Sequence, residues 1–392
     1  MDERGLFIAA YDADEACMAE LCRMFGISRK TGYKWIARYE ADGLLGLGDR
    51  SHAPLSCPHR VSDDVVSRIL ALRHLHPSWG PKKLKAYLMA REPRTPWPAA
   101  STMGDLIVAA GLSVPRRKRI RVPLASAPLA HAVAPNDVWT ADFKGWFRTG
   151  DGRRCDPFTL SDAASRYLLR CQSVARADSA HVWPILDAAL REFGAPRLFR
   201  SDNGAPFASR GAGGLTRLSV KLIQAGVTPE RIAPGKPQEN GRHERMHLTL
   251  SQDTAQPPAA TLRAQQRRFD DFRRVYNDER PHEALGQETP STQYAPSSRR
   301  YSGRLRAPDY PADCEVRQVR RKGEIKWRGG YVFLNEALAG QPVALRETDN
   351  GHWRVDYGPV HLGCIEHDGK LKRPGPRPRT RARAPKTQHP PE

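Results

Sequence analysis

Apolar side chains in the first part of the chain recur with the period of an amphipathic helix. From Met18 to Phe25 they are three or four positions apart, and Gly26 follows as a helix stop. Ser28 is a favourable N-cap for a second helix, which is rich in basic residues. A helix, a glycine turn and a basic helix are typical of the helix-turn-helix, whose second helix enters the major groove of DNA. We therefore expect a helix-turn-helix DNA-binding domain over residues 1–55, with an ordinary helical hairpin as the alternative. The residues expected to contact DNA are Arg29, Lys30, Lys34 and Arg38.

A second helical pattern fills residues 60–114. Apolar residues recur at helical spacing after Ser62, and a later helix is expected between a cap at Ser101 and a stop at Gly111. This pattern predicts a second helix-turn-helix or winged helical domain, which would lengthen the DNA site. The basic linker at 115–135 is expected to follow the DNA phosphates. The DNA contacts expected from these two segments are Lys82, Lys83, Arg116, Arg117, Lys118 and Arg119.

Between residues 136 and 300 the pattern changes to strands and helices in alternation. Apolar and polar side chains alternate within "DVWTADFKGWF", residues 137–147, which predicts a half-buried strand. Two further strands with a short connection follow, then a helix ended by Gly194, a strand ended by Asp202 and more helices. This order predicts a layered α/β domain.

The C-terminal part is predicted to be all-β and to end in a basic tail. Residues 310–366 show short strand patterns separated by Gly and Asp-Asn-Gly turns, for which a small β-barrel is the expected architecture. Residues 367–392 are rich in Pro and basic residues, which predicts a disordered tail that contacts DNA.

The charge balance narrows the function. The 392-residue chain has 63 Lys and Arg against 43 Asp and Glu, a formal net charge of +20, and such an excess favours a polyanionic partner, most often nucleic acid. Charge alone also allows ribosomal or anionic-membrane binding. Seven Cys without a Cys-x-x-Cys pair indicate reduced thiols. Because no apolar stretch could span a membrane and no signal-peptide pattern is present, we expect a cytoplasmic protein.

Three carboxylates occupy positions in the α/β domain that suit metal chemistry. Asp142 is on the polar face of the first strand, Asp202 ends a later strand, and Glu244 is near the start of a helix. Two carboxylates brought to about 4 Å repel by roughly 4 kcal/mol at an effective dielectric near 20. A hard divalent cation, Mg²⁺ or Mn²⁺, removes that penalty, and two such ions would activate an oxygen for in-line phosphoryl displacement. The residues leave a second interpretation open for Asp202, as the cap of a turn through Asn203 and Gly204.

The carboxylates lie in three characteristic segments, "WTADFKGWF", "FRSDNGAPFAS" and "PGKPQENGRHERMHLTL". These segments resemble the acidic motifs of the integrase catalytic core, which retroviral integrases share with bacterial insertion-sequence transposases. "YNDERPHEALGQETPSTQY" resembles the segment that follows the core in the bacterial members, so the similarity covers about residues 10–300. The resemblance implies a ribonuclease-H-like fold and an Asp-Asp-Glu site, made by Asp142, Asp202 and Glu244, that binds two Mg²⁺ ions.

The third motif contains a second acidic residue, Glu239. The family's pattern places two residues between Pro-Gln-x-x-Gly and the catalytic Glu, which selects Glu244. The separation of the second and third acids is longer than is usual in the family and fits a glycine-rich insertion at "SRGAGG". Lys236, Arg242 and Arg245 flank the third acid and are expected to contact DNA.

Together these features predict a DNA transposase that binds the terminal inverted repeats of a mobile element. It would hydrolyse a phosphodiester at each element end and transfer the new 3′ end to target DNA. We expect it to act on double-stranded DNA as a homo-oligomer, associated with the bacterial nucleoid, with a separate ATPase helper if one is needed. The alternatives are a helix-turn-helix regulator with an inactive integrase-like core, a ribonuclease of the same fold, and an architectural DNA protein.

Overall fold

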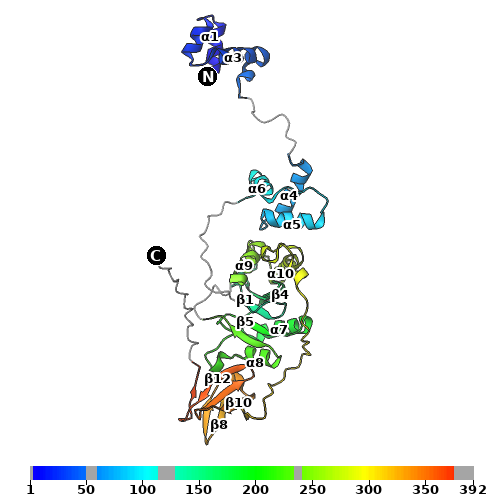
Figure 1. Ribbon diagram of the computed structural model, residues 1–392, viewed down its shortest axis with the longest axis vertical. Coiled ribbons are helices and arrows are strands. Elements are labelled where there is room, and N and C mark those ends of the chain that lie inside the picture. The colour runs from blue at the N-terminus through cyan, green and yellow to red at the C-terminus, as the bar shows by residue number, and fades with distance from the viewer. Residues whose placement is uncertain (1–2, 50–59, 114–128, 234–240, 375–392) are drawn as a thin grey trace, which may run out of the picture. The chain divides into compact units, whose positions relative to one another are not determined.

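The structure, a computed structural model, describes residues 3–49, 60–113, 129–233 and 241–374 (Figure 1). Its contacts divide the chain into two units, Met1–Ser62 and Asp63–Glu392. Each unit has buried hydrophobic clusters of its own. Among the residues described, no helix is long and apolar enough to cross a lipid bilayer.

The first unit is a helical domain that contains a helix-turn-helix. Its elements are α1 (Glu3–Asp12), α2 (Met18–Met24), α3 (Arg29–Asp42) and the 3₁₀ turn η1 (Gly43–Leu47). Gly26 adopts a φ of +60° between α2 and α3, and the Ser28 hydroxyl accepts a hydrogen bond from the Thr31 amide at 3.2 Å. Gly32 permits close packing of α3 on α2, because a Cβ there would lie 2.9 Å from the Cys22 Sγ. The predicted helix stop and N-cap are confirmed.

Three helices open the second unit. They are α4 (Asp63–Leu75), α5 (Pro81–Arg91) and α6 (Ala100–Ala109). Ile69, Leu84 and Met103, one from each helix, are fully buried. Helix α6 begins at Ala100, so Ser101 lies inside its first turn and the predicted cap at Ser101 is wrong. The described residues of this domain include no strand, so the winged form is not observed.

A six-stranded sheet forms the centre of the α/β domain, in the order β2-β3-β1-β5-β6, with β4 paired to β3. Its strands are β1 (Val138–Phe143), β2 (Phe147–Arg148), β3 (Arg154–Asp162), β4 (Leu168–Val174), β5 (Leu198–Ser201) and β6 (Thr228–Arg231). Strand β1 pairs antiparallel with β3 and parallel with β5. The predicted α/β layering is confirmed, but β6 was not expected. Its Pro229 is a strand breaker inside a sheet and is tolerated at the edge position that β6 occupies.

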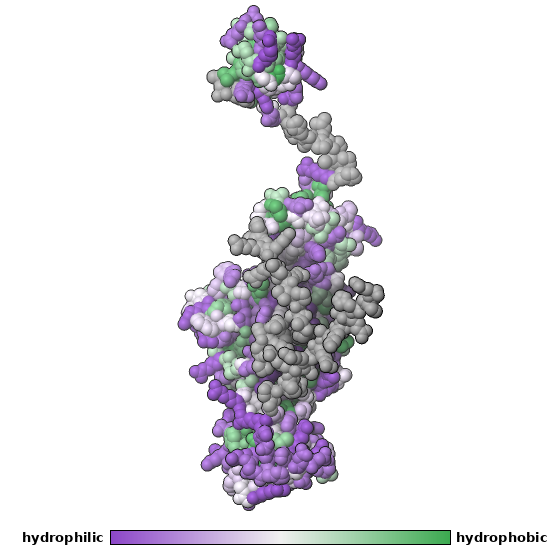
Figure 2. Space-filling view, turned by 60° about the vertical axis from the view of Figure 1, so that its left-hand side comes forward, coloured by the Kyte–Doolittle hydropathy of each residue, from purple (hydrophilic) through white to green (hydrophobic). Residues whose placement is uncertain are grey.

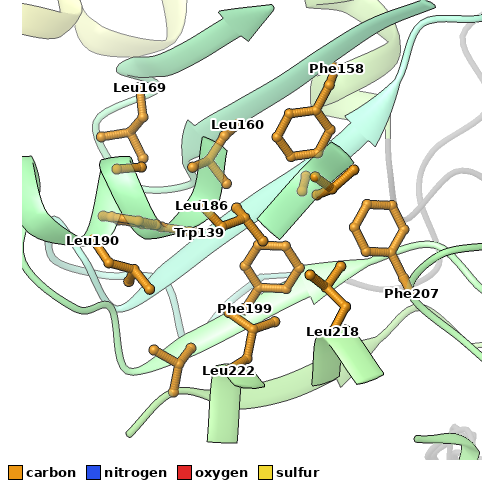
Figure 3. Packing of buried hydrophobic residues seen from close by; sticks show 14 of the residues in the cluster. Trp139, Phe158, Leu160, Leu169, Leu186, Leu190, Phe199, Phe207, Leu218 and Leu222 are labelled. Atoms are coloured by element: carbon orange, nitrogen blue, oxygen red, sulfur yellow. The ribbon is translucent and has the colours of Figure 1, made fainter. Parts of the chain in front are cut away.

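Helices cover both faces of this sheet. On one face, α7 (Ser179–Phe193) and α8 (Arg217–Gln224) bury Leu186 and Leu218 against Trp139 and Phe199 of the sheet (Figure 3). On the other face, α9 (Gly241–Leu250) and α10 (Leu262–Arg274) pack on β3 and β4. Side chains alternate along a strand, so Trp139 faces the first layer and Asp142 faces α9.

The chain leaves the α/β domain through short helical turns. Helix α9 runs into the π-helical turn η4 (Ser251–Ala255), and α10 runs into a second one, η5 (Val275–Glu279). The turns η6 (Glu283–Leu285) and α11 (Pro290–Gln293) follow. These turns were expected as helical and irregular structure.

The C-terminal part forms an open sheet and a separate hairpin. Five strands pair in the order β13-β12-β11-β10-β7, and β8 pairs only with β9. The strands are β7 (Glu315–Gln318), β8 (Glu324–Trp327), β9 (Gly330–Phe333), β10 (Pro342–Glu347), β11 (Trp353–Tyr357), β12 (Val360–Ile365) and β13 (Leu371–Lys372), with the 3₁₀ turn η7 (Glu336–Leu338) after β9. The predicted closed barrel is therefore wrong. The tail was predicted to begin at residue 367, but residues 371 and 372 belong to strand β13, so that start is wrong. Residues 375–392 of the predicted tail lie outside the described part of the chain.

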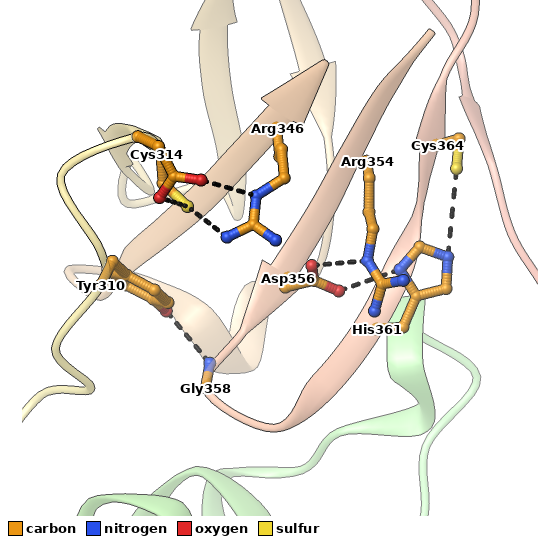
Figure 4. Close-up of polar contacts among 9 residues, drawn as sticks. Tyr310, Cys314, Arg346, Arg354, Asp356, Gly358, His361 and Cys364 are labelled. Carbon is orange, nitrogen blue, oxygen red and sulfur yellow. Dashed lines mark hydrogen bonds and ion pairs between the residues drawn. The ribbon is translucent and has the colours of Figure 1, made fainter. Parts of the chain in front are cut away.

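The open sheet buries its apolar face by docking on the α/β domain instead of closing on itself. Leu215 and Ile223, at α8, share one buried cluster with Val355 and Leu362 of the sheet. The glycine-rich segment forms the turn η2 (Ala212–Gly214), which contacts the C-terminal sheet. The side-chain amide of Asn335, from the C-terminal part, donates to the carbonyl oxygens of Ala212 at 3.2 Å and Leu215 at 3.0 Å. The surface of this region is mostly hydrophilic (Figure 2). On it, Asp356 accepts from Arg354 at 2.7 Å and contacts His361 at 3.0 Å (Figure 4).

Candidate active site

The strand order places the first two predicted carboxylates on neighbouring parts of the sheet. Asp142 is on β1, which pairs in parallel with β5 up to Thr140 and Arg200. Asp202 directly follows Ser201, the last residue of β5, and neighbouring strands are about 4.8 Å apart. This arrangement depends on the pairing of strands that are distant in sequence.

Asp142 is a half-buried carboxylate with defined neighbours. Its Oδ1 accepts a hydrogen bond from the Phe143 amide at 2.8 Å. Its Oδ2 lies 3.9 Å from Nδ1 of His247, and 16% of the Asp142 side chain is exposed. The carboxylate is thus oriented by the backbone on one side and faces an imidazole on the other.

Asp202 caps the loop that follows β5. Its Oδ1 accepts from the Gly204 amide at 3.1 Å, and the Asn203 side chain donates to the Ile232 carbonyl at 2.9 Å. A Cβ at position 204 would lie 3.0 Å from Asp202 Oδ2, so glycine lets the turn fold tightly over the carboxylate. The capping role considered for Asp202 is observed, and it fixes the same carboxylate that we predict to bind metal.

Glu244 is exposed in the first turn of α9, whose opposite side is anchored to the sheet. Two buried histidines make the anchor. His243 Nε2 lies 3.4 Å from Ser161 Oγ, and His247 Nε2 lies 2.7 Å from Thr159 Oγ1. Residues three apart on a helix are neighbours on its surface, so Glu244 lies on the flank that carries His247. The third carboxylate is therefore on an element that contacts the strand of Asp142.

The three carboxylates lie on adjoining elements without forming a closed ligand shell. Over the described ranges, no three His, Cys, Asp or Glu side chains converge closely enough to hold a metal ion. The chemistry of the donor set nevertheless fits a hard cation, because three carboxylates supply the oxygen ligands that Mg²⁺ and Mn²⁺ select. Of the three, Glu244 is the most exposed.

The histidines of α9 are neutral in this fold. Burial, together with the neighbouring His247, lowers the pKa of His243 to about 3. Burial, together with the charge of Lys144, lowers the pKa of His247 to about 4. His243, directly before Glu244 in the sequence, packs against the sheet. The spacing of four residues between the two histidines, one helical turn, was the signal that they share one face.

Some of the residues predicted to contact DNA are exposed, and others are hydrogen-bonded within the protein. In α3, Arg29, Lys30 and Lys34 are exposed and Arg38 is partly exposed, as a groove-binding helix requires. Arg242 donates to the Ala163 carbonyl at 2.8 Å, and Arg245 is exposed. Arg116, Arg117, Lys118, Arg119 and Lys236 lie outside the described residues.

The two lysines at the start of α5 are engaged with the segment that follows α10. The Lys83 ammonium donates to the Pro281 carbonyl, and burial with the charge of Arg280 lowers its pKa to about 8. Lys82 lies 3.7 Å from Glu283 and is largely exposed. The local pattern gave no sign of these contacts, because Lys83 and Pro281 are far apart in sequence. Their geometry assigns Lys83 a structural role and leaves the DNA contact as a prediction for Lys82.

Four models of known protein families match parts of the chain. Two models described as integrase core domain match residues 132–237 and 225–290. A helix-turn-helix domain model matches residues 3–54, and a homeodomain-like domain model matches residues 31–107.

Two curated relatives come from bacterial insertion elements. The chain is 28% identical over 277 residues to the 39.2 kDa protein of insertion element IS476 from Xanthomonas euvesicatoria, covering 70% of this chain and 76% of the relative. It is 28% identical over 272 residues to the 31.7 kDa protein of insertion element IS407 from Burkholderia multivorans, covering 69% and 87%.

Solved structures similar to this one include retroviral integrases. The catalytic core of HTLV-2 integrase, solved with magnesium, is 14% identical with a TM-score of 0.33 and covers 41% of this chain and 97% of its own. The simian T-cell lymphotropic virus intasome, solved with a PP2A regulatory subunit, is 16% identical with a TM-score of 0.37 and covers 73% and 91%.

Proposed function

We propose that this chain, which belongs to the insertion-element transposases of the integrase superfamily, cuts DNA at the ends of its element and joins those ends to target DNA. The observation that supports the proposal is the parallel pairing of β1, which bears Asp142, with β5, which Asp202 follows directly. Helix α9, which bears Glu244, also brings His247 to 3.9 Å from Asp142. A chain with this site and two helical domains before it has the parts that end recognition and phosphodiester chemistry require.

The catalytic residues of the proposal are Asp142, Asp202 and Glu244, which would hold two Mg²⁺ or Mn²⁺ ions. Ions bound there would activate a water or a 3′-hydroxyl and neutralise the charge of the leaving oxygen. The Phe143 and Gly204 amides orient the two aspartates before substrate arrives. Glu244 would complete the site from α9 when DNA is in place.

Recognition of the element ends is proposed for the helical domains. Helix α3 presents Arg29, Lys30 and Lys34 to solvent, which suits a helix that enters the major groove. The terminal inverted repeats are the expected sequence, and the exposed Arg245 is placed to contact phosphates near the site. Because two element ends must be brought together, the active form would be at least a dimer on DNA, working on the bacterial nucleoid. The comparisons lend no support to a separate ATPase helper.

The test uses the full chain, Mg²⁺ and labelled duplex DNA that carries the flanks of the chain's own gene. We expect nicking at one defined position at the element end. Asp142→Asn, Asp202→Asn and Glu244→Gln should each abolish nicking while end binding in a gel-shift assay persists. Glu239→Gln is the matched control and should keep the activity.

Three outcomes would contradict this assignment. Nicking that survives Asp202→Asn at the wild-type rate would remove the proposed site. End binding by the wild type without nicking in Mg²⁺ or Mn²⁺ would instead favour a DNA-binding regulator with an inactive core. Cleavage of RNA–DNA hybrids without preference for the element ends would indicate a ribonuclease.

A further inference from the structure

His247 lies between the core of the sheet and the Asp142 carboxylate. Its Nε2 is 2.7 Å from Thr159 Oγ1, and its Nδ1 is 3.9 Å from Asp142 Oδ2. Only 11% of the imidazole side chain is exposed. A buried imidazole that contacts a hydroxyl through one nitrogen and faces a carboxylate with the other is placed by its neighbours, so its protonation pattern can be derived from them.

The contacts of Thr159 permit a tautomer with the imidazole proton on Nε2. Thr159 Oγ1 lies 3.1 Å from the Asp142 carbonyl oxygen, which can only accept, and a hydroxyl that donates there accepts from Nε2 at 2.7 Å. In this tautomer the lone pair of Nδ1 is on the side of the Asp142 carboxylate.

Nδ1 of His247 and Oδ2 of Asp142 face each other across 3.9 Å. This distance is too long for a hydrogen bond between them. A divalent ion bonds to imidazole nitrogen and carboxylate oxygen at about 2.0–2.2 Å, so two such bonds span about 4.2 Å in a straight line. A sub-ångström movement of either side chain would bring both atoms to one ion.

We propose that Nδ1 of His247 is a nitrogen ligand of the divalent ion that Asp142 binds. This inference rests on the proposed function, since it adds a fourth side chain to the site of Asp142, Asp202 and Glu244. A mixed nitrogen and oxygen set favours transition metals over Mg²⁺, which prefers oxygen ligands. The site is therefore expected to bind Mn²⁺ more tightly than Mg²⁺, and to lose part of that preference without the imidazole.

The same helix offers a matched control. His243 is one turn earlier, is buried like His247, and contacts Ser161 on the same strand. His243→Gln therefore perturbs the packing of α9 to a similar degree, while Nδ1 of His247 stays in place. His247→Gln is the informative change, because its amide can replace Nε2 in the bond to Thr159 but has no atom at the position of Nδ1.

The experiment is electron spin-echo envelope modulation of Mn²⁺ bound to the full chain. We expect ¹⁴N modulation from a directly bound imidazole in the wild type and in His243→Gln. The modulation should change to the ¹⁵N pattern when the wild type is made with ¹⁵N-histidine, a test that needs no variant. In His247→Gln the modulation should vanish, and titration should show Mn²⁺ affinity reduced about 10- to 100-fold with Mg²⁺ affinity changed less.

The failures of the two proposals are distinguishable. Suppose that the wild type binds Mn²⁺ without nitrogen modulation and that Asp142→Asn abolishes this binding. That result would overturn the histidine ligand alone. Modulation that persists in a folded His247→Gln would overturn it as well. A wild type that binds no Mn²⁺ in a manner dependent on Asp142 and Asp202 would overturn the metal site itself, and with it the proposed function.

Discussion

Asn136 connects the start of β1 to the segment after α11, and its replacement by Ala should loosen the α/β domain. Its Oδ1 accepts from Trp139 Nε1 and from the Tyr294 hydroxyl, each at 2.9 Å. Its Nδ2 donates to the Ala295 carbonyl at 2.8 Å, and its amide donates to Asp162 at 2.7 Å. The residue is buried and has a φ of +66°, a conformation that Asn tolerates better than Ala.

The expected cost follows from what the substitution leaves behind. Asn136→Ala removes the acceptor of two donors, one on the fully buried Trp139 and one on Tyr294, whose pKa burial raises. A buried donor without a partner costs about 1–3 kcal/mol, so two orphaned donors should lower the opening free energy of β1 by at least about 2 kcal/mol, a large part of the stability of an ordinary domain. Ala also lacks the short polar side chain that lets Asn tolerate a left-handed conformation, which adds to this cost.

Hydrogen exchange of the full chain, read by mass spectrometry on peptides that cover β1, measures this opening free energy. Asn136→Gly separates the contributions, because glycine keeps the backbone conformation and loses only the side chain. In the Asn136→Ala background, Tyr294→Phe removes the orphaned hydroxyl, so the double variant should be less destabilised than the sum of the single variants by about 1 kcal/mol. Strict additivity, or a loss below about 1 kcal/mol in Asn136→Ala, would refute the reasoning.

Three further predictions concern titration and charge. Burial lowers the pKa of His282 to about 3 in the fold, so the stability that a neutral His282 provides is present above pH 6.5 and is lost as pH falls below that value. By pH 5 the wild type should lose at most about 2 kcal/mol of unfolding free energy in this way. The melting temperature of His282→Gln should therefore fall less with acid than that of the wild type, and an equal fall would contradict the prediction. For Lys83, whose pKa is about 8 in the fold, the unfolded chain takes up the proton first as pH falls from 10.5 to 8. As pH falls over that range, the wild type should lose stability and Lys83→Met should not, so the unfolding free energy of the variant relative to wild type should rise and then level off below pH 8. A difference that does not change with pH would show that burial does not lower the pKa of Lys83. Binding of element-end DNA should weaken steeply with salt, and Lys34→Ala should lower the slope of log K against log salt by about 1; an unchanged slope would mean that Lys34 does not contact a phosphate.

The amphipathic periods and local caps of the chain were sufficient to predict several elements. The Ser28 cap and the stop at Gly26 define a helix-turn-helix from short-range geometry alone, because a cap and its helix are adjacent in sequence. The alternation through β1 similarly identified Asp142 as a polar position opposite buried Trp139. The acidic motifs led to the integrase family because the family conserves residue types around each acid.

Other features depend on pairing across the chain, which a local pattern does not encode. Whether β1 lies beside β5 decides that the strand of Asp142 pairs with the strand that Asp202 follows. The inward direction of His247 on α9 depends on the strand that the helix covers. The closed barrel was a mistaken prediction for the same reason, since strand propensities are equally satisfied by a barrel and by an open sheet.

Amino-acid sequence by itself predicted the helix-turn-helix, the alternation of strands and helices in the α/β domain, and the three acids proposed as the site. Tertiary structure alone decided how the C-terminal sheet covers its apolar face, by docking on Leu215 and Ile223. It also decided that Lys83 supports the fold and that an imidazole faces Asp142. The physical reason is that periodicity and capping are energies of neighbouring residues, whereas burial, register and the protonation of enclosed groups depend on which distant segments come into contact.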